Sequence, residues 1–287
     1  MQDFSDRVAV ITGAAGGIGL ALARQALARG MRLVLSDLDR DALQAAGRAL
    51  GADPARLQLH AADVSRDAEV AALAEAAFAR FGAVHLLCNN AGVGFSRLAA
   101  EHSAADWEWV IGVNLFSVAH GIRHFLPRMQ AAGAPAHVLN TASAAGLVST
   151  SGLSAYNASK QGVVALSETL RAELVAQQSP IEVSVLCPAW VPTGIHASSR
   201  VRPQRYGATE PASEASRPYE QTMEHAVLAG RLSADDIARI AFEAMARGQL
   251  YILPHARIGQ AVQERFAEIA AAAVHTPAAQ PSPAPTP

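Results

Sequence analysis

The stretch TGAAGGIG, residues 12–19, decides how this chain folds. It lies between the apolar run RVAVIT (7–12), which has the pattern of a buried strand, and the helical pattern GIGLALARQALARG (17–30). Glycines at such a turn let the backbone approach a diphosphate group, whose charge then faces the N-terminus of the helix. The spacing G-x-x-x-G-x-G differs from the standard G-x-G-x-x-G. A tight connection without a ligand is the alternative, but its place after the first strand favours a dinucleotide site.

Strand and helix patterns alternate along the rest of the chain. Further short apolar runs occupy 31–37, 56–63, 84–90, 136–143, 181–188 and 250–254, and further helical patterns occupy 39–50, 65–82, 103–133, 153–178 and 233–248. The apolar runs lack internal polar alternation, which is typical of parallel strands buried on both faces. This alternation predicts an α/β fold, namely a single-domain, doubly wound (Rossmann-type) parallel seven-stranded sheet with helices on both faces.

Two segments interrupt the alternation. Residues 193–231 form a long polar stretch rich in Arg, Glu, Ser and Pro, and we predict that they form a lid over the substrate site. With so little apolar surface, this lid is not expected to order by itself. Residues 276–287, TPAAQPSPAPTP, are expected to be a disordered tail that follows a single domain at 1–275.

The composition excludes several classes of partner. A net charge of −2 and a pI near 6.5 leave no electrostatic footprint for nucleic acid or an anionic membrane. No apolar run reaches the length of a membrane span, and the N-terminus enters a strand too early for a signal peptide. Cys88 and Cys187 fall in predicted strands and are expected to be buried thiols. We therefore expect a soluble, cytoplasmic protein with no nucleic-acid and no membrane partner.

An acidic residue at the end of the second predicted strand points to the cofactor. Asp37 stands 18 residues beyond Gly19, where a carboxylate can accept hydrogen bonds from both ribose hydroxyls and would repel a 2′-phosphate. The nearby cation, Arg40, is expected to be solvated. These residues favour NAD over NADP. Asp63, at the end of the third predicted strand, either accepts from the adenine amino group or caps the helix that follows.

The segment SAYNASK, residues 154–160, opens another helical pattern. Its Tyr156 and Lys160 are four residues apart and therefore share one face of that helix. A surface pair is the ordinary interpretation of Y-x-x-x-K when it stands by itself. The other motifs of the chain have to decide between that interpretation and a role in proton transfer.

Taken together, the motifs resemble those of the short-chain dehydrogenase/reductase family of the NAD type. The resemblance runs from the first strand to about residue 255 and rests on TGAAGGIG (12–19), Asp63, NNAG (89–92), Asn114, Ser143, YNASK (156–160) and PAWVPT (188–193). It implies a catalytic tetrad of Asn114, Ser143, Tyr156 and Lys160. The cofactor contacts that it implies are Gly13, Gly17, Ile18, Gly19, Asp37, Asp63, Val64, Asn90, Ala91, Gly92, Tyr156, Lys160, Pro188, Val191 and Thr193.

Each member of the implied tetrad has a task, because a proton must move when the cofactor moves a hydride. A free tyrosine titrates near pH 10. The ammonium of Lys160 is expected to lower the pKa of Tyr156 and to hold the nicotinamide ribose. Ser143 is expected to donate to the substrate oxygen, with a turn cap as the alternative. Asn114, a poor helix former in mid-helix, is expected to hold a water beside Lys160, with simple tolerance as the alternative.

A narrower resemblance concerns the substrate. The stretches 111–129, 200–207 and 250–255 are similar to bacterial NAD-dependent dehydrogenases of bulky aryl alcohols, such as those that oxidise the α-carbon of lignin-type aryl ethers. An apolar pocket for such a substrate is expected from Phe95, Ala145, Leu153 and Trp190.

Two features of the second half qualify these expectations. Ala189 stands where the family usually has glycine, which is expected to stiffen the turn near the nicotinamide without abolishing binding. Arg200, Arg202 and Arg205 either meet an anionic substrate or, as we expect, belong to a solvated lid.

The sequence thus predicts an enzyme that interconverts a bulky or aromatic secondary alcohol and its ketone with NAD, using Tyr156 as general acid and base. The alternatives are an NADP-linked carbonyl reductase and a non-catalytic dinucleotide-binding regulator of the same fold, and the intact tetrad disfavours the regulator. No metal is expected, because the sequence contains no HExxH motif. The long apolar helices at 103–133 and 153–178 suit a homodimer or homotetramer.

Overall fold

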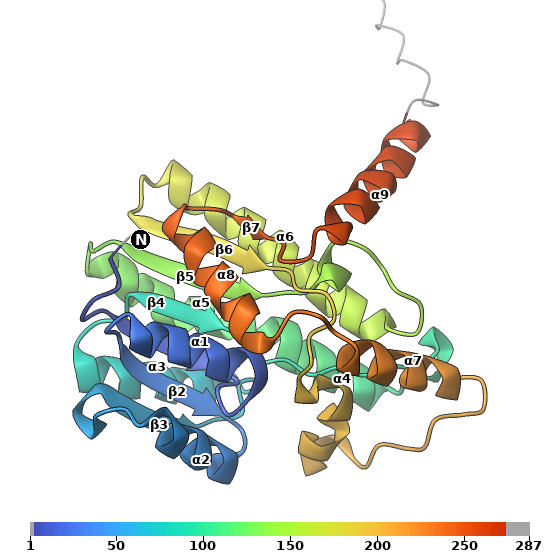
Figure 1. Cartoon of the computed structure of the whole chain (residues 1–287), viewed down its shortest axis with the longest axis horizontal. Coiled ribbons are helices and arrows are strands. Elements are labelled where there is room, and N and C mark those ends of the chain that lie inside the picture. The colour runs from blue at the N-terminus through green and yellow to red at the C-terminus, as the bar shows by residue number, and fades with distance from the viewer. Residues whose placement is uncertain (1–2, 274–287) are drawn as a thin grey trace, which may run out of the picture.

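The computed structural model describes residues 3–273, which fold around one seven-stranded sheet (Figure 1). The strand order is β3-β2-β1-β4-β5-β6-β7, and all neighbouring strands are parallel. The predicted doubly wound sheet is confirmed, although its last strand is shorter than expected. The strands are β1 (Val8–Thr12), β2 (Arg32–Asp37), β3 (Leu57–Ala61), β4 (Leu86–Asn89), β5 (Ala136–Thr141), β6 (Ile181–Leu186) and β7 (Tyr251–Ile252).

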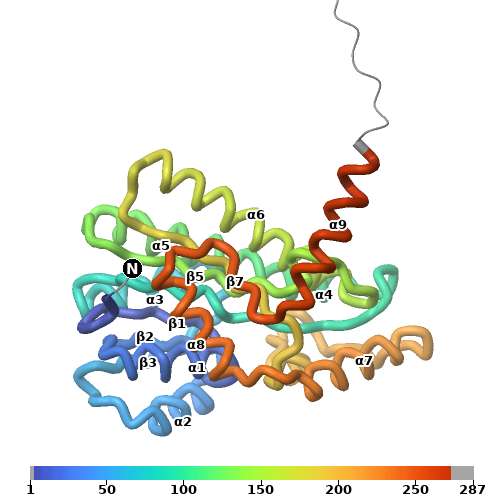
Figure 2. Tube along the Cα trace, turned by 45° about the horizontal axis from the view of Figure 1, so that its top comes forward, coloured from blue at the N-terminus to red at the C-terminus, as the bar shows by residue number. Residues whose placement is uncertain are grey.

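Helices cover both faces of this sheet (Figure 2). The buried side chains of α1, α2 and α8 share one core, and those of α3, α5 and α6 share another. The helices are α1 (Gly17–Ala28), α2 (Arg40–Leu50), α3 (Asp67–Phe81), α4 (Ala104–Ile111), α5 (Ser117–Ala131), α6 (Ser154–Ala176), α7 (Arg217–Leu228), α8 (Ala234–Ala246) and α9 (Arg257–Ala273).

The two cores explain why the strands lack polar alternation. Successive side chains of a strand point to opposite faces of the sheet. In β1, Ile11 packs in the core with α1 and α8, whereas the adjacent Val10 packs in the core with α3 and α5, and neither is accessible to solvent. Both faces therefore require apolar residues.

The order of the strands also places the functional site. β1 pairs with β2 on one side and with β4 on the other, so the sheet reverses its winding between β1 and β4. The connections that leave these two strands diverge, and ligands of doubly wound sheets bind in the crevice between them. The glycine loop that follows β1 and the NNAG segment at the end of β4 lie at this crevice.

The long helix predicted at 103–133 is interrupted in the structure. α4 ends at Ile111, and a five-residue π-helical segment, Gly112–Phe116, leads into α5. Single π turns inside α-helices are frequent at functional sites. The prediction of one continuous helix was wrong here because Asn114 turns its amide toward the loop after β4 and binds the backbone of Val93.

The segment 193–231 has more regular structure than its composition suggested. It contains 3-10 turns at Gly194–Val201 and Gln204–Tyr206 and then α7. The side chain of Arg202, expected on a solvated lid, is buried, and its Nη1 lies 2.5 Å from Asp106 Oδ1. This buried ion pair thus supplies a contact that the few apolar residues of this segment do not provide.

The C-terminal part of the chain leaves the body of the molecule. α9 projects away from the sheet (Figure 1) and carries the exposed side chains of Phe266 and Ile269. The tail predicted at 276–287 lies outside the described residues. Within residues 3–273, none of the helices combines the length and hydropathy that crossing a bilayer requires.

Candidate active site

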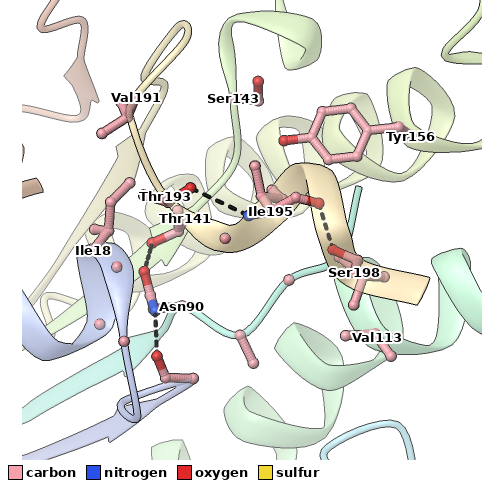
Figure 3. A pocket seen from close by; sticks show the side chains of 18 of the residues that line it. Ile18, Asn90, Val113, Thr141, Ser143, Tyr156, Val191, Thr193, Ile195 and Ser198 are labelled. Carbon is pink, nitrogen blue, oxygen red and sulfur yellow. Dashed lines mark hydrogen bonds between the residues drawn. The ribbon is translucent and has the colours of Figure 1, made fainter. Parts of the chain in front are cut away.

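A cavity of about 800 Å³ opens at the carboxyl ends of the central strands. Its wall includes the glycine loop, the ends of β2, β4 and β5, the first turns of α6, and the segment that follows β6. Figure 3 shows Tyr156 of α6 beside Ser143, with Ile195 of the segment after β6 near them. Residues distant in the sequence thus meet around one space.

The glycines of the loop are required by its geometry. Gly13 and Gly17 have φ values of 65° and 52°, in the left-handed region that favours glycine. A Cβ atom at Gly19 would lie 2.0 Å from the carbonyl oxygen of Gly13. Side chains are excluded here because the loop folds back tightly on the start of α1, whose free N–H groups then face the cavity.

Asp37 holds this loop against the end of β2. Its Oδ2 accepts the N–H of Ala15 at 3.0 Å and its Oδ1 accepts the N–H of Asp39 at 3.2 Å. The carboxylate lies at the edge of the cavity, where the sequence placed it.

Asp63 lines the cavity beyond Asp37 and is bound to the lid segment. Its Oδ1 accepts from the backbone N–H and the hydroxyl of Ser65, and its Oδ2 lies 2.6 Å from Nη1 of Arg205. Partial burial favours a higher pKa for Asp63, but the hydrogen bonds from Arg205 and Ser65 outweigh it and the pKa is lowered. Because α3 begins at Asp67 with Arg66 as its N-cap residue, Asp63 does not cap that helix.

Asn90 joins the ends of three strands. Its side-chain nitrogen donates to the Thr12 carbonyl at 3.0 Å. Its side-chain oxygen accepts from the Thr141 hydroxyl at 3.2 Å (Figure 3). The hydroxyl of Thr12 accepts the N–H groups of Asn90 and Ala91. This network fixes the NNAG segment against β1 and β5.

Three of the four implied catalytic side chains line the cavity together. Ser143 follows β5, and Tyr156 and Lys160 lie one turn apart on α6. The hydroxyl of Ser143 accepts the N–H of Ala145 at 3.1 Å. The Nζ of Lys160 donates to the carbonyl of Thr141 at 2.9 Å and lies 5.8 Å from the centre of the Tyr156 ring. The shared helix face predicted for the pair is therefore directed into the site.

Burial dominates the pKa values of this pair. It raises the pKa of Tyr156, an effect that a hydrogen bond with Ser143 partly offsets. It lowers the pKa of Lys160 from 10.5 to about 8. The expected lowering of the tyrosine pKa by the ammonium is not found in the protein alone, because desolvation disfavours the charged form of both groups.

Asn114 is fully buried and does not reach the cavity wall. Its nitrogen donates to the Val93 carbonyl and to Ser159 Oγ, both at 3.0 Å, and its oxygen accepts the Val93 N–H at 2.8 Å. A Cβ atom at Gly92 would lie 3.3 Å from both Asn114 Oδ1 and Lys160 Nζ. Asn114 therefore ties the loop after β4 to α6 beside Lys160, and a water held there stays a prediction.

The segment PAWVPT lies against the glycine loop. A Cβ atom at Gly17 would stand 3.2 Å from the methyl group of Thr193. The N–H of Ala189, at the position where glycine is usual, donates to Nδ1 of His255 at 3.1 Å, so the turn has a backbone anchor of its own. Pro188 and Val191, predicted as cofactor contacts, line the cavity.

Many of the side chains that line the cavity are apolar. Ala145, Leu153 and Trp190 are among the lining residues, whereas Phe95 is not and packs against Trp109. The sequence did not predict that α7 forms part of the cavity wall. Met223 and Val227 of α7 are apolar residues four apart in a polar segment, and this spacing indicates a helix face that packs inward. The apolar lining residues that were not predicted as pocket residues include Val93, Trp109, Val113, Ile195, Val201, Met223, Val227 and Ile258.

His120 and His124 have a spacing on α5 that can suit a metal. However, His124 Nε2 lies 2.8 Å from Asp67, and His120 Nδ1 contacts the Val64 carbonyl at 3.2 Å. Throughout residues 3–273, there is no group of three or more histidine, cysteine or acidic side chains arranged to hold a metal ion.

Known proteins share this arrangement. The family model described as short chain dehydrogenase matches residues 7–204. A short chain dehydrogenase/reductase from Burkholderia phymatum, crystallised in complex with NAD, is 43% identical with a TM-score of 0.92, covering 98% of this chain and 100% of that one.

Two curated relatives are similar over most of their length. The CLA biosynthesis dehydrogenase/reductase of Lactiplantibacillus plantarum is 34% identical over 272 residues, which are 94% of this chain and 95% of the relative. The C alpha-dehydrogenase of a Sphingobium species is 30% identical over 274 residues, 94% of this chain and 87% of the relative. Sequence, fold and cavity agree, and the chain belongs to the short-chain dehydrogenase family of oxidoreductases.

Proposed function

We propose that this protein is an NAD-dependent oxidoreductase that interconverts a neutral, bulky or aromatic secondary alcohol and its ketone, with Tyr156 as the general acid and base. One observation carries the proposal: Ser143, Tyr156 and Lys160 line the same cavity as the glycine loop and Asp37. A site for hydride transfer needs the proton-transfer group and the cofactor cradle to share one space.

The residues of the cavity fit NAD. Gly13 and Gly19 let the loop fold tightly onto the N-terminus of α1, since a side chain at either would collide with backbone. Such a glycine loop suits a diphosphate facing the helix N-terminus. The carboxylate of Asp37 suits a ribose with free hydroxyls and repels a 2′-phosphate. The relative from Burkholderia phymatum that is similar over the whole chain was crystallised with NAD, which supports the same cofactor here.

The protein has to orient the substrate and move a proton, while NAD when bound accepts or returns the hydride. The phenol of Tyr156 gives its proton to a ketone oxygen or takes it from an alcohol. The hydroxyl of Ser143 donates to the same oxygen. Lys160, with its pKa near 8, carries a positive charge at neutral pH that stabilises the phenolate in the transition state.

The apolar lining of the cavity supports the substrate class. Aliphatic and aromatic side chains, including Leu153, Trp190 and Met223, line the same cavity as Tyr156. Such a wall favours a large apolar group on the carbinol carbon, because apolar area buried on binding is favourable. The similarity to a C alpha-dehydrogenase supports the narrower resemblance, which implies an alcohol next to an aryl ring.

We also propose that the enzyme is a homodimer or homotetramer. Phe116 and Val175 lie on the helices expected to pair subunits, and both side chains are more than half exposed. This exposure supports a homodimer or homotetramer. A cytoplasmic location stays a prediction.

A panel of secondary alcohols, tested with NAD and with NADP at the nicotinamide absorbance, tests the proposal. Turnover should be found with NAD, and aryl alcohols should have higher kcat/KM than short aliphatic or carboxylated ones. Turnover with NADP alone would favour the carbonyl reductase alternative. Binding of NADH without turnover of any alcohol or ketone would favour the regulator.

A further inference from the structure

Three arginines of the lid segment differ in what they contact. Arg202 pairs with the buried Asp106, and Arg205 pairs with Asp63. The guanidinium of Arg200 makes neither a hydrogen bond nor an ion pair with any residue of the described part of the chain, yet it lines the cavity. Among the lining residues only Lys160 carries another positive charge, and that side chain is buried against Thr141.

Successive contacts connect Arg200 with the glycine loop. Its Nη2 lies only 2.6 Å from the point where a Cβ of Gly194 would stand, so the absence of a side chain lets the guanidinium lie on the backbone. The preceding residue, Thr193, packs its methyl group against Gly17. Thr193 and Gly194, two consecutive residues, thus connect the glycine loop at the start of α1 with the guanidinium of Arg200.

The loop needs such a cation. The first turn of α1 contains no basic side chain, and the loop presents only backbone N–H groups to an anion. The titratable lining residues nearest to it are acidic, namely Asp37, Asp39 and Asp63. A helix terminus offers about half a positive charge, which leaves most of the charge of a diphosphate to be offset by another group. A guanidinium matches two phosphate oxygens at once.

We propose that Arg200 binds the diphosphate of the dinucleotide cofactor and closes the lid segment over it. The inference rests on the proposed function, since it assumes that a dinucleotide occupies the cavity. An anionic substrate is a different occupant for the same guanidinium, but Arg200 lies against Gly194, the residue next to the Thr193 that packs on the glycine loop, and this favours the diphosphate.

Calorimetric titration with ADP-ribose tests the inference without turnover, because this ligand has the diphosphate and lacks the nicotinamide. Arg200→Ala should weaken ADP-ribose binding about tenfold, which corresponds to about 1.4 kcal/mol. Arg200→Lys should retain most of the affinity. In Arg200→Ala, the affinity for ADP-ribose should decrease less steeply with salt concentration than in the parent. Arg217→Ala is the matched control, since Arg217 is an exposed arginine of α7 outside the cavity lining. Adenosine should bind all four proteins equally.

Three other outcomes would overturn the inference. Equal ADP-ribose affinity of Arg200→Ala and the parent would show that the side chain does not contact the diphosphate, while dinucleotide binding by the parent would leave the proposed function intact. A raised KM for carboxylated alcohols alone would assign Arg200 to the substrate. A parent protein that binds neither ADP-ribose nor NADH would remove the proposed function and this inference with it.

Discussion

Replacing Lys160 with methionine should make the ligand-free protein more stable while it abolishes turnover. Lys160 is buried, and burial lowers its pKa from 10.5 to about 8. At about 1.4 kcal/mol for each pH unit, this shift means that the charged side chain costs the folded state about 3 kcal/mol at neutral pH. Methionine has a similar length without the charge. It leaves the Thr141 carbonyl without its donor, at a cost of about 1 kcal/mol. The net gain expected is about 2 kcal/mol.

The pH dependence gives this prediction its sign. The pKa of Lys160 is lower in the folded protein than in the unfolded chain, so between about pH 8 and 10.5 the unfolded chain binds more protons. The stability of the parent therefore rises with pH across that window as the cost of the buried charge disappears, and the methionine variant lacks this rise. The advantage of the variant should shrink by about 2 kcal/mol between about pH 7 and pH 9.5.

Urea unfolding followed by circular dichroism, at these two pH values, measures the difference between the two proteins. Other groups that titrate in this range, such as Tyr156 and the two cysteines, are present in both proteins and largely cancel in the comparison. A variant that is less stable than the parent by the same amount at both pH values would refute the reasoning. It would show that the hydrogen bond of Lys160 outweighs its desolvation.

Three further changes test separate parts of the site. Asp37→Ala should weaken NADH binding tenfold or more, since each charged hydrogen bond contributes about 1.5–3 kcal/mol. It should also reduce the difference between the affinities for NADH and NADPH. Fluorescence titration measures both affinities, and a parent that already prefers NADPH would contradict the assignment. Arg202→Ala should destabilise the fold by about 3 kcal/mol, because Asp106 is left as a buried unpaired charge; a thermal midpoint equal to that of the parent would show that the pair is not formed. Gly19→Ala should displace the glycine loop and weaken NADH binding by more than tenfold, whereas Gly259→Ala, with open space around the added methyl, should bind as the parent does.

The parts of the structure that depend on short sequence segments could be predicted from the sequence. The strand-to-helix turn at 12–19, the acidic end of β2 and the shared face of Tyr156 and Lys160 each follow from local geometry. The parallel sheet followed from runs of apolar residues without alternation. These features are fixed by backbone sterics and by burial of both faces of the sheet. Both effects determine the residue types within a few consecutive positions, so a short segment shows them.

Features that depend on distant contacts could not be predicted. The π segment at Gly112–Phe116 arises because Asn114 binds Val93, a residue far from it in the sequence. The order of the lid segment depends on ion pairs of Arg202 and Arg205 with acidic residues near α4 and β3. The raised pKa of Tyr156 reflects burial, which the spacing of a tyrosine and a lysine does not reveal.

The central claim is that the hydroxyl of Tyr156 transfers the proton in an NAD-linked reaction, and Tyr156→Phe tests it most directly. The variant keeps the ring that lines the cavity and loses only the hydroxyl, so NADH should bind within about twofold of the parent while kcat with the best alcohol of the panel falls at least about 10²-fold. Tyr251→Phe, at an exposed tyrosine that bonds Glu168 outside the cavity, is the control and should be fully active. Turnover by Tyr156→Phe within about tenfold of the parent would contradict the account, because loss of a general acid and base typically costs 10²-fold or more.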